Sequence, residues 1–258
     1  HWRDREVAAP KQPDVVLFVD TFSRWFEPEH ARAAVDLLRA GSWTPVVPTH
    51  EGRPLCCGRT CLSAGLLDQA RVEARRLLAA LLPHARAGRP IVGVEPSCLY
   101  TLRDEIPALL PGTEARLLAD QAVMLEELLD AGWSDGRPLE LNALSSRRIL
   151  VHGHCHQKAF GGTSATIRML SRVPGAEVEE IRSGCCGMAG AFGYHAEHYR
   201  ISMEMGELEL FPSLRQAGGD ALVVADGTSC RAQIADGVGL EAVHAAVLLR
   251  AALAGHGL

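Results

Sequence analysis

The sequence lacks the features that would indicate a membrane protein or a nucleic-acid-binding protein. Its longest apolar runs, such as Leu77 to Leu82, are far too short to span a bilayer. No secretory signal peptide is visible. The net charge is −5 and the pI about 6.1, so we expect neither nucleic acid nor an anionic membrane as partner. The chain begins at His1 rather than Met, which suggests a processed chain or a piece of a longer one, with residues 1–13 as a polar linker.

The cysteines lack the density of a disulfide scaffold. Eight cysteines are spread over 258 residues, whereas a small secreted domain would be shorter and richer in cysteine. We therefore expect reduced thiols, gathered at a metal in a cytoplasmic chain. Two motifs are also absent from the sequence: Cys-x-x-Cys, which is typical of zinc knuckles, and a Gly-x-Gly-x-x-Gly after a strand, which is typical of nucleotide binding.

A Cys-Cys-Gly triplet occurs twice, at Cys56-Cys57-Gly58 and at Cys185-Cys186-Gly187. Adjacent cysteines are poor disulfide partners because the ring that joins them is strained. Thiolates bind soft metals, and Gly58 and Gly187 let backbone N–H groups approach a metal-bound sulfur without a Cβ in the way. The alternative is two buried, small hydrophobic side chains, the usual state of free cysteine. The repetition of the triplet argues against that alternative.

The two triplets belong to an internal duplication. Each half has the order strand, polar loop, helix, strand, Cys-Cys-Gly, helix, strand, Ser-Cys, helix. The spacing from Cys57 to Cys98 differs by only three positions from that between Cys186 and Cys230. Strands that alternate with helices predict parallel sheets covered by helices. We predict an α/β fold with two Rossmann-like halves related by a pseudo-twofold, at residues 14–131 and 147–258.

The apolar patterns predict the individual elements. We expect strands at residues 15–19, 44–48, 91–94, 149–151, 178–181 and 221–225. We expect helices at residues 27–41, 63–87, 102–110, 117–129, 164–171, 194–216 and 242–252. The polar, turn-rich stretch from Gly132 to Ser146 separates the halves.

The cysteines of the second half follow three different predicted strands. Loops after parallel strands emerge at one edge of the sheet, where such folds place their ligands. We therefore expect one metal site built from Cys155, Cys185, Cys186 and Cys230. Four thiolates suit a [4Fe–4S] cluster, with tetrahedral zinc as the alternative. Vicinal cysteines and the absence of Cys-x-x-Cys favour iron–sulfur.

The first half is not an equal copy. Cys56, Cys57 and Cys98 occupy matching positions, but we equate Cys155 with Asp20. A site with three thiolates and an aspartate or an open position suits zinc or a second cluster, or stays empty. Cys61 lies one turn beyond the pair, and we expect it to be a core thiol rather than a ligand.

Histidines and basic residues flank these motifs. We expect His152, His154 and His156 to hydrogen-bond to backbone or cluster sulfur rather than bind the metal, because four cysteines are already available. Four basic residues lie in or just after the same loops and together are candidates to face an acidic substrate or partner: Arg24, Arg59, Arg103 and Lys158.

Five motifs resemble the cysteine-rich CCG-domain family: Pro54–Gly58, Glu95–Cys98, His152–Lys158, Cys185–Gly190 and Asp226–Cys230. The family includes the cysteine-rich subunit of heterodisulfide reductase and the iron–sulfur subunits of glycolate oxidase and anaerobic glycerol-3-phosphate dehydrogenase. The sequence is most similar to the C-terminal iron–sulfur region of long FAD-linked oxidases that act on 2-hydroxy acids such as lactate, glycolate or 2-hydroxyglutarate. The similarity extends over nearly all residues from Val15 to Leu253.

This resemblance implies an iron–sulfur electron-transfer module. A flavin domain or subunit with bound FAD would oxidise the substrate, and electrons would pass through the module to an acceptor such as a quinone. The chain itself would have no dehydrogenase activity, and any attachment to a membrane would be through its partners. We expect Gly58, Gly187, His154 and His156 to contact the cofactor.

Two departures from the family pattern bear on function. Heterodisulfide-reductase-like members have Cys-x-x-Cys at the last motif, where this chain has Gly227, and related subunits have a cysteine where we place Asp20. Both departures argue against five-cysteine clusters. The alternatives to electron transfer are a cluster-based thiol or disulfide reductase and a zinc-stabilised interaction module.

Overall fold

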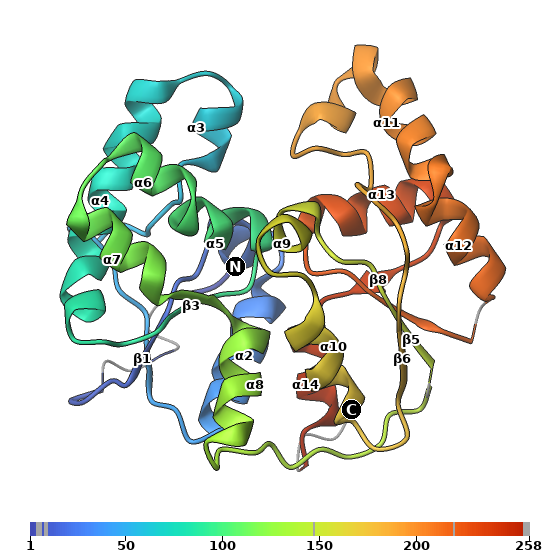
Figure 1. The fold of residues 1–258 in the computed structure, drawn as a ribbon, viewed down its shortest axis with the longest axis horizontal. Helices are drawn as coiled ribbons and strands as arrows, with labels where there is room; N and C mark the ends of the chain where they lie inside the picture. Colours follow the sequence, from blue (N-terminus) through green and yellow to red (C-terminus); the bar gives the residue numbers. More distant parts are fainter. Residues whose placement is uncertain (4–6, 8–9, 147, 219, 255–258) are drawn as a thin grey trace. The chain divides into compact units, whose positions relative to one another are not determined.

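The computed structural model describes residues 1–3, 7, 10–146, 148–218 and 220–254. The chain divides into two compact units, His1–Leu139 and Glu140–Leu258 (Figure 1). The limits expected from the sequence, 1–13, 14–131 and 147–258, remain predictions, and parts of the first and last of these ranges lie outside the described residues. Near the chain start, Trp2 is buried and its backbone N–H donates to the Arg24 carbonyl at 2.7 Å.

The first unit contains four strands and eight helices in its described part. In chain order they are β1 (Val15–Leu17), α1 (Thr21–Trp25), α2 (Pro28–Ala40), β2 (Pro45–Val46), α3 (Arg59–Ser63), α4 (Leu67–Arg86), β3 (Ile91–Gly93), α5 (Pro96–Arg103), α6 (Glu105–Leu109), α7 (Thr113–Gln121), β4 (Ala122–Met124) and α8 (Leu125–Ser134).

The second unit also contributes four strands. Its described elements are β5 (Arg148–Val151), α9 (Cys155–Phe160), α10 (Ser164–Ser171), β6 (Glu177–Glu180), the 3-10 helix η2 (Phe192–Tyr194), α11 (Ala196–Leu208), α12 (Leu210–Ala217), β7 (Leu222–Val224), α13 (Thr228–Val238), β8 (Ala242–Val243) and α14 (Ala245–Ala252).

Each unit is built around one parallel sheet, and the two sheets have the same strand order. The order is β2-β1-β3-β4 in the first unit and β6-β5-β7-β8 in the second. Every pair of neighbouring strands is parallel. The predicted α/β class, with a parallel sheet in each half, is confirmed.

The fourth strand of each sheet was not predicted. The expected helix over residues 117–129 is divided into α7, β4 and α8, and Ala122 of β4 pairs with Ile91 of β3. The expected helix over residues 242–252 begins with β8, where Ala242 pairs with Val223. These predictions were wrong because an edge strand of two or three residues next to a helix leaves the apolar spacing of the helix unbroken. Only pairing with a neighbouring strand reveals such a strand.

Three helices begin directly at the cysteine motifs, α5 earlier than the helix expected at 102–110 and α9 and α13 outside the predicted helix ranges. Cys98, Cys155 and Cys230 lie in the first turns of α5, α9 and α13. The side chain of Glu95 accepts a hydrogen bond from the Ser97 N–H and so caps α5. The helix expected at 63–87 is found as α4, with the short α3 before it, whereas the helix expected at 194–216 is divided into α11 and α12.

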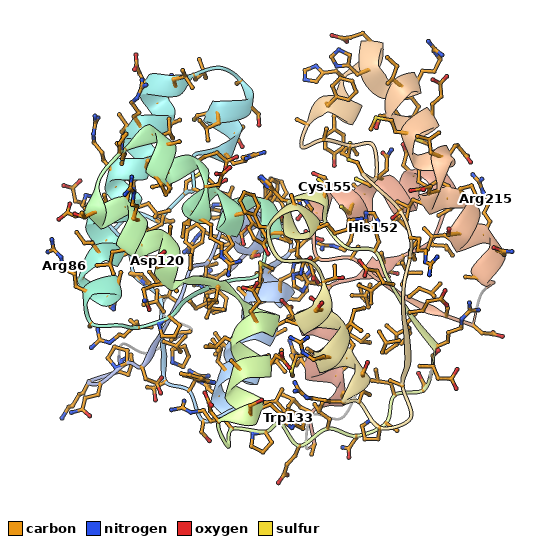
Figure 2. The ribbon with its side chains drawn as sticks, in the orientation of Figure 1. Arg86, Asp120, Trp133, His152, Cys155 and Arg215 are labelled. Atoms are coloured by element: carbon orange, nitrogen blue, oxygen red, sulfur yellow. The ribbon has the colours of Figure 1, made fainter. Side chains whose placement is uncertain are left out.

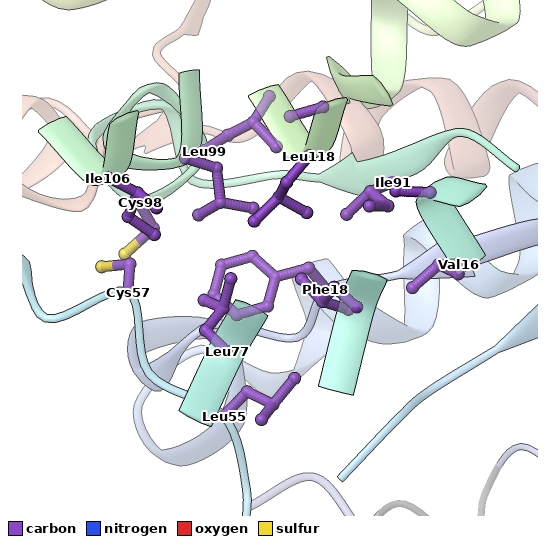
Figure 3. Packing of buried hydrophobic residues seen from close by; sticks show 14 of the residues in the cluster. Val16, Phe18, Leu55, Cys57, Leu77, Ile91, Cys98, Leu99, Ile106 and Leu118 are labelled. Carbon is purple, nitrogen blue, oxygen red and sulfur yellow. The ribbon is translucent and has the colours of Figure 1, made fainter. Parts of the chain in front are cut away.

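The cysteines lie at the edge of a hydrophobic core in each unit. In the first unit, Cys57 and Cys98 pack with Phe18, Leu77 and Leu99 (Figure 3). In the second unit, the equivalent core includes Cys186, Met188, Leu210, Phe211 and Cys230. Within the described ranges, no helix combines the length and apolar character needed to cross a membrane.

Leu99 offers a test of how much the hydrophobic core around the first cysteine site contributes to the stability of the first unit. It is fully buried on α5, next to Cys98 in sequence. Leu99→Ala should lower the free energy of unfolding by about 3 kcal/mol, through lost burial and the cavity left behind. Urea denaturation measures this loss. Leu67→Ala is the control, because Leu67 is 47% exposed, and its effect should stay within about 0.5 kcal/mol. Equal effects of the two substitutions would contradict this description of the core.

Candidate metal centre

The second unit gathers four thiols at the carboxyl ends of its strands. Cys155 follows β5, Cys185 and Cys186 follow β6, and Cys230 follows β7. The strand order of the sheet makes these three loops neighbours, because β5 lies between β6 and β7. Figure 2 marks Cys155 and His152 in this part of the fold. All eight cysteines of the chain are free thiols.

The four sulfur atoms interact in a row, Cys155 with Cys185, Cys185 with Cys186, and Cys186 with Cys230. The neighbouring sulfurs and burial raise the pKa of Cys155 and of Cys186 above its usual range. The neighbouring thiols lower the pKa of Cys185 and of Cys230 below its usual range. A metal binds all four as thiolates, so its binding would release the protons that they carry.

Glycine at position 187 shapes the loop that carries the central pair. Its φ is +98°, a conformation that side chains with a Cβ rarely adopt, and a Cβ would lie 2.1 Å from the Ser202 carbonyl oxygen. The Gly187 N–H donates to Cys185 Sγ at 3.4 Å. In the first unit, the Gly58 N–H makes the matching contact to Cys56 Sγ at 3.5 Å. The positive φ angles and the N–H contacts to sulfur explain why glycine occupies positions 58 and 187. The contact of these glycines with a cofactor remains a prediction.

Lys158, on α9, holds the same loop from the neighbouring strand end. Its Nζ donates to the carbonyl oxygens of Ser183 and Gly184, at 2.5 and 2.8 Å. The other basic residues singled out in the sequence are also engaged within the chain. Arg24 is buried, Arg59 pairs with Glu105, and Arg103 pairs with Glu127. Their expected role in facing an acidic partner therefore finds no support in these contacts.

Two histidines lie against the cysteine row. His154 caps α9 by accepting a hydrogen bond from the His156 N–H at 3.2 Å. A Cβ at Gly227 would lie 2.5 Å from His154 Cδ2, so the ring occupies the space beside this glycine. His152 is buried, and one of its ring nitrogens lies within 4.8 Å of the sulfurs of Cys186 and Cys230. Both imidazoles help to lower the pKa of Cys230.

The position of His154 explains the missing fifth cysteine. Gly227 stands where heterodisulfide-reductase-like proteins have the first cysteine of Cys-x-x-Cys. A cysteine here would place its Cβ against the His154 ring. The site of the second unit is therefore built for four thiols and neighbouring imidazoles.

His156 lies farther along the same helix. Its ring centroid is 6.2 Å from that of His154 and 5.9 Å from that of Phe160. The cofactor contacts predicted for His154 and His156 remain predictions. His152, by contrast, was not singled out among the three histidines by the sequence, although its place directly after a buried strand was a usable signal.

The first unit brings together the three thiols predicted for it. Cys57 lies between Cys56 and Cys98 and interacts with both. The side chains of Cys57 and Cys98 point toward one another (Figure 3). Cys61 is half-buried on α3 rather than in the core.

The strand register corrects the expected equivalence of Asp20 with Cys155. Leu17 pairs with Val92 in the first unit, and Val151 pairs with Val224 in the second. Counting from these pairs, the equivalent of Cys155 is Thr21, whose hydroxyl donates to Cys56 Sγ at 3.7 Å.

The same register sets three further pairs of equivalent positions. Asp20 corresponds to His154, and both cap a helix. Phe18 corresponds to His152, and Glu95 corresponds to Gly227. The sequence alone misassigned Asp20 because polar side chains occur at two consecutive positions there and no partner strand set the register.

Carboxylates make the first site less favourable for thiolates. Asp20 is buried, and burial together with the neighbouring Glu95 raises its pKa to about 6. For Cys98, the hydrogen bond from Cys57 lowers the pKa, but burial and the charges of Asp20 and Glu95 outweigh it and raise the pKa to about 12. The imidazoles of the second unit act in the opposite direction on Cys230. The donor set and its surroundings thus fit a soft metal in the second unit better than in the first.

The chain is similar to several known proteins. Residues 149–235 match the family model described as "CCG: Cysteine-rich domain". The chain is 29% identical over 255 residues to a subunit of the anaerobic glycerol-3-phosphate dehydrogenase of Escherichia coli, covering 97% of this chain and 62% of that protein. It is 26% identical over 228 residues to D-2-hydroxyglutarate dehydrogenase of Escherichia coli, covering 88% and 21%. It is also 26% identical over 188 residues to lactate utilization protein A of Bacillus velezensis, covering 69% and 74%.

Gly187→Ala tests whether the Cys-Cys-Gly loop must keep its conformation. The added Cβ meets the Ser202 carbonyl oxygen at 2.1 Å, so the loop must move and the Cys185 and Cys186 thiols with it. We expect at least a tenfold loss of metal affinity, measured by competition with a chromophoric chelator. Gly190→Ala is the matched control, because Gly190 also has a positive φ but nothing lies within 4 Å of the added Cβ. Equal metal affinity in the two variants would show that the loop geometry does not matter.

Proposed function

We propose that the chain, whose residues 149–235 match the CCG cysteine-rich domain model, is the iron–sulfur electron-transfer module of a flavin-linked 2-hydroxy acid oxidoreductase. The observation that carries the proposal is the convergence of Cys155, Cys185, Cys186 and Cys230 from three neighbouring strand ends, beside two imidazoles, at the carboxyl edge of a parallel sheet. The chain spans 62% of the length of the first relatives that it matches. The activity of the whole protein is therefore part of the proposal.

Cys155, Cys185, Cys186 and Cys230 would hold a [4Fe–4S] cluster. Such a cluster, when bound, exchanges single electrons without forming bonds to a substrate. The chain's own residues provide the environment for it. Cys186 and Cys230 are buried and shield one side from water, whereas Cys155 is exposed. This asymmetry gives an electron a short path between the site and a partner on the side of Cys155.

The three thiols of the first unit would form a weaker, second site. Cys56, Cys57 and Cys98, with Asp20 close by, are suited to zinc, or to a cluster that lacks one protein thiolate. Burial and the charges of Asp20 and Glu95 raise the pKa of Cys98 to about 12, so this thiol would lose its proton to a metal less readily than an ordinary cysteine.

The partner would be a flavin-containing dehydrogenase domain or subunit, which carries FAD and oxidises the substrate. The names of the relatives support substrates of the hydroxy acid type or a related alcohol: glycerol 3-phosphate, 2-hydroxyglutarate and lactate. Electrons would leave to an acceptor such as a quinone. Any contact of this chain with a membrane would be made through that partner or acceptor.

A zinc-stabilised interaction module is the second candidate, and one observation favours it. The ligand atoms of His152, Cys186 and Cys230 lie within 4.8 Å of one another, a spacing compatible with a single tetrahedral ion with Zn–S bonds of about 2.3 Å. A cluster-based disulfide reductase is less favoured, since the His154 ring fills the place of the fifth cysteine.

Metal analysis of two cysteine variants separates these candidates. After anaerobic reconstitution, Cys185→Ser should lose at least nine tenths of the iron and acid-labile sulfide, because this sulfur interacts with both Cys155 and Cys186 in the row. Cys61→Ser should retain both, because Cys61 lies outside the row. Equal iron content in the two variants would refute the ligand assignment. Stoichiometric zinc without sulfide in the unmodified chain would support the interaction module.

Turnover assays test the relay role. A cysteine-bound cluster provides neither a base nor a hydride acceptor for a hydroxy acid, so the loaded chain alone should not oxidise lactate, 2-hydroxyglutarate or glycerol 3-phosphate with a dye as acceptor. Adding the flavoprotein to the loaded chain should restore electron flow to the dye. Adding it to the Cys185→Ser chain should not restore this flow. Steady turnover by the loaded chain without flavoprotein would place the catalytic centre elsewhere.

A further inference from the structure

His152 is a buried polar side chain directly beside the sulfur row. It follows β5 by one residue and is only 1% exposed. Its backbone N–H is already used, since it donates to the Val224 carbonyl oxygen at 2.8 Å. Burying an imidazole among apolar residues costs free energy unless both ring nitrogens find partners. The partners of the two nitrogens therefore indicate what this side chain does.

The two ring nitrogens have different surroundings. Nδ1 lies 2.9 Å from the Ser183 hydroxyl oxygen. Nε2 is fully buried and has no hydrogen-bond partner of normal geometry in the part of the chain that the structure describes. A His152 ring nitrogen lies within 4.8 Å of Sγ of both Cys186 and Cys230. Since Nδ1 is directed to Ser183, Nε2 is the nitrogen that the sulfurs face.

Ser183 orients the ring through the hydrogen bond at Nδ1. When the serine hydroxyl donates this bond, the proton of the neutral ring lies on Nε2 and an N–H points toward the sulfurs. Ser183 is itself held in place, because its carbonyl oxygen accepts from Lys158 Nζ and its N–H donates to the Ile181 carbonyl oxygen at 2.8 Å.

The first unit shows that the fold does not require histidine here. The equivalent of His152 is Phe18, which is 1% exposed and packs in the hydrophobic core. An aromatic ring of similar shape fills the same place in the same sheet architecture. The imidazole therefore adds a polar N–H to a position that packing alone would fill with carbon.

We propose that His152 is a positioning residue that donates its Nε2–H to the sulfurs of Cys230 and Cys186 and thereby raises the reduction potential of the metal centre. The inference rests on the proposed cluster. A hydrogen bond to a ligating thiolate withdraws electron density from the sulfur and stabilises the more negative, reduced state. Ser183 acts indirectly, because its hydrogen bond to Nδ1 fixes the orientation and the tautomer of the His152 ring.

Redox titration of the reconstituted chain, followed by electron paramagnetic resonance, tests this role. His152→Phe copies the side chain of the first unit and should keep the iron and sulfide content. We expect it to reduce the equilibrium constant for cluster reduction about tenfold, a downward shift of about 59 mV for a one-electron couple. His152→Gln restores an N–H donor and should recover most of that shift. His195→Phe, which removes an exposed imidazole from the same unit, should leave the potential unchanged.

Ser183→Ala provides a second measurement that does not depend on the folding of a His152 variant. It removes the partner of Nδ1, and we expect a smaller shift in the same direction. An unchanged potential in fully loaded His152→Phe would overturn the proposal. Loss of iron with altered resonance positions in both His152→Phe and His152→Gln would also overturn it, because that result identifies His152 as a ligand. Absence of iron and sulfide in the unmodified chain would instead refute the proposed function.

Discussion

The negative charge of clustered thiolates is the constraint on which both cysteine sites depend. Sulfurs that lie close together at the edge of a hydrophobic core repel one another as soon as more than one is ionised. In the second unit, backbone N–H groups, thiol donors and two imidazoles offset that charge around Cys185 and Cys230. In the first unit, the negative charges of Asp20 and Glu95 add to the repulsion and disfavour a thiolate at Cys98. The same scaffold thus holds one site suited to a soft metal and one that is less suited.

A few positions separate the two sites, and each has a steric or electrostatic reason. Thr21 replaces Cys155 and keeps a hydrogen bond to the first sulfur of the pair, although a hydroxyl is a poor ligand for a soft metal. Glu95 replaces Gly227, where only glycine leaves room for the ring of His154. Phe18 replaces His152. The sheets keep the same strand order throughout, so the difference in chemistry comes from side chains at strand ends rather than from the fold.

The arrangement of burial suits transfer of electrons rather than chemistry on a substrate. The sulfurs at one end of the row are buried, and Cys155 at the other end is exposed. Among the residues that the structure describes, thiols, imidazoles and backbone N–H groups surround the site, and such groups tune the potential of a bound metal centre. In the function that we propose, the catalytic step falls to a flavin partner.

The sequence by itself determined the fold class and the convergence of the cysteines. Apolar runs at strand length, the repeated Cys-Cys-Gly and the rule that parallel strands end at one edge were sufficient, because these signals are local or follow from topology. Tertiary structure alone decided the rest. Strands β4 and β8 depend on pairing with β3 and β7, which no local pattern shows. The equivalence of Thr21 with Cys155 depends on strand register, and the orientation of His152 depends on Ser183, 31 positions away.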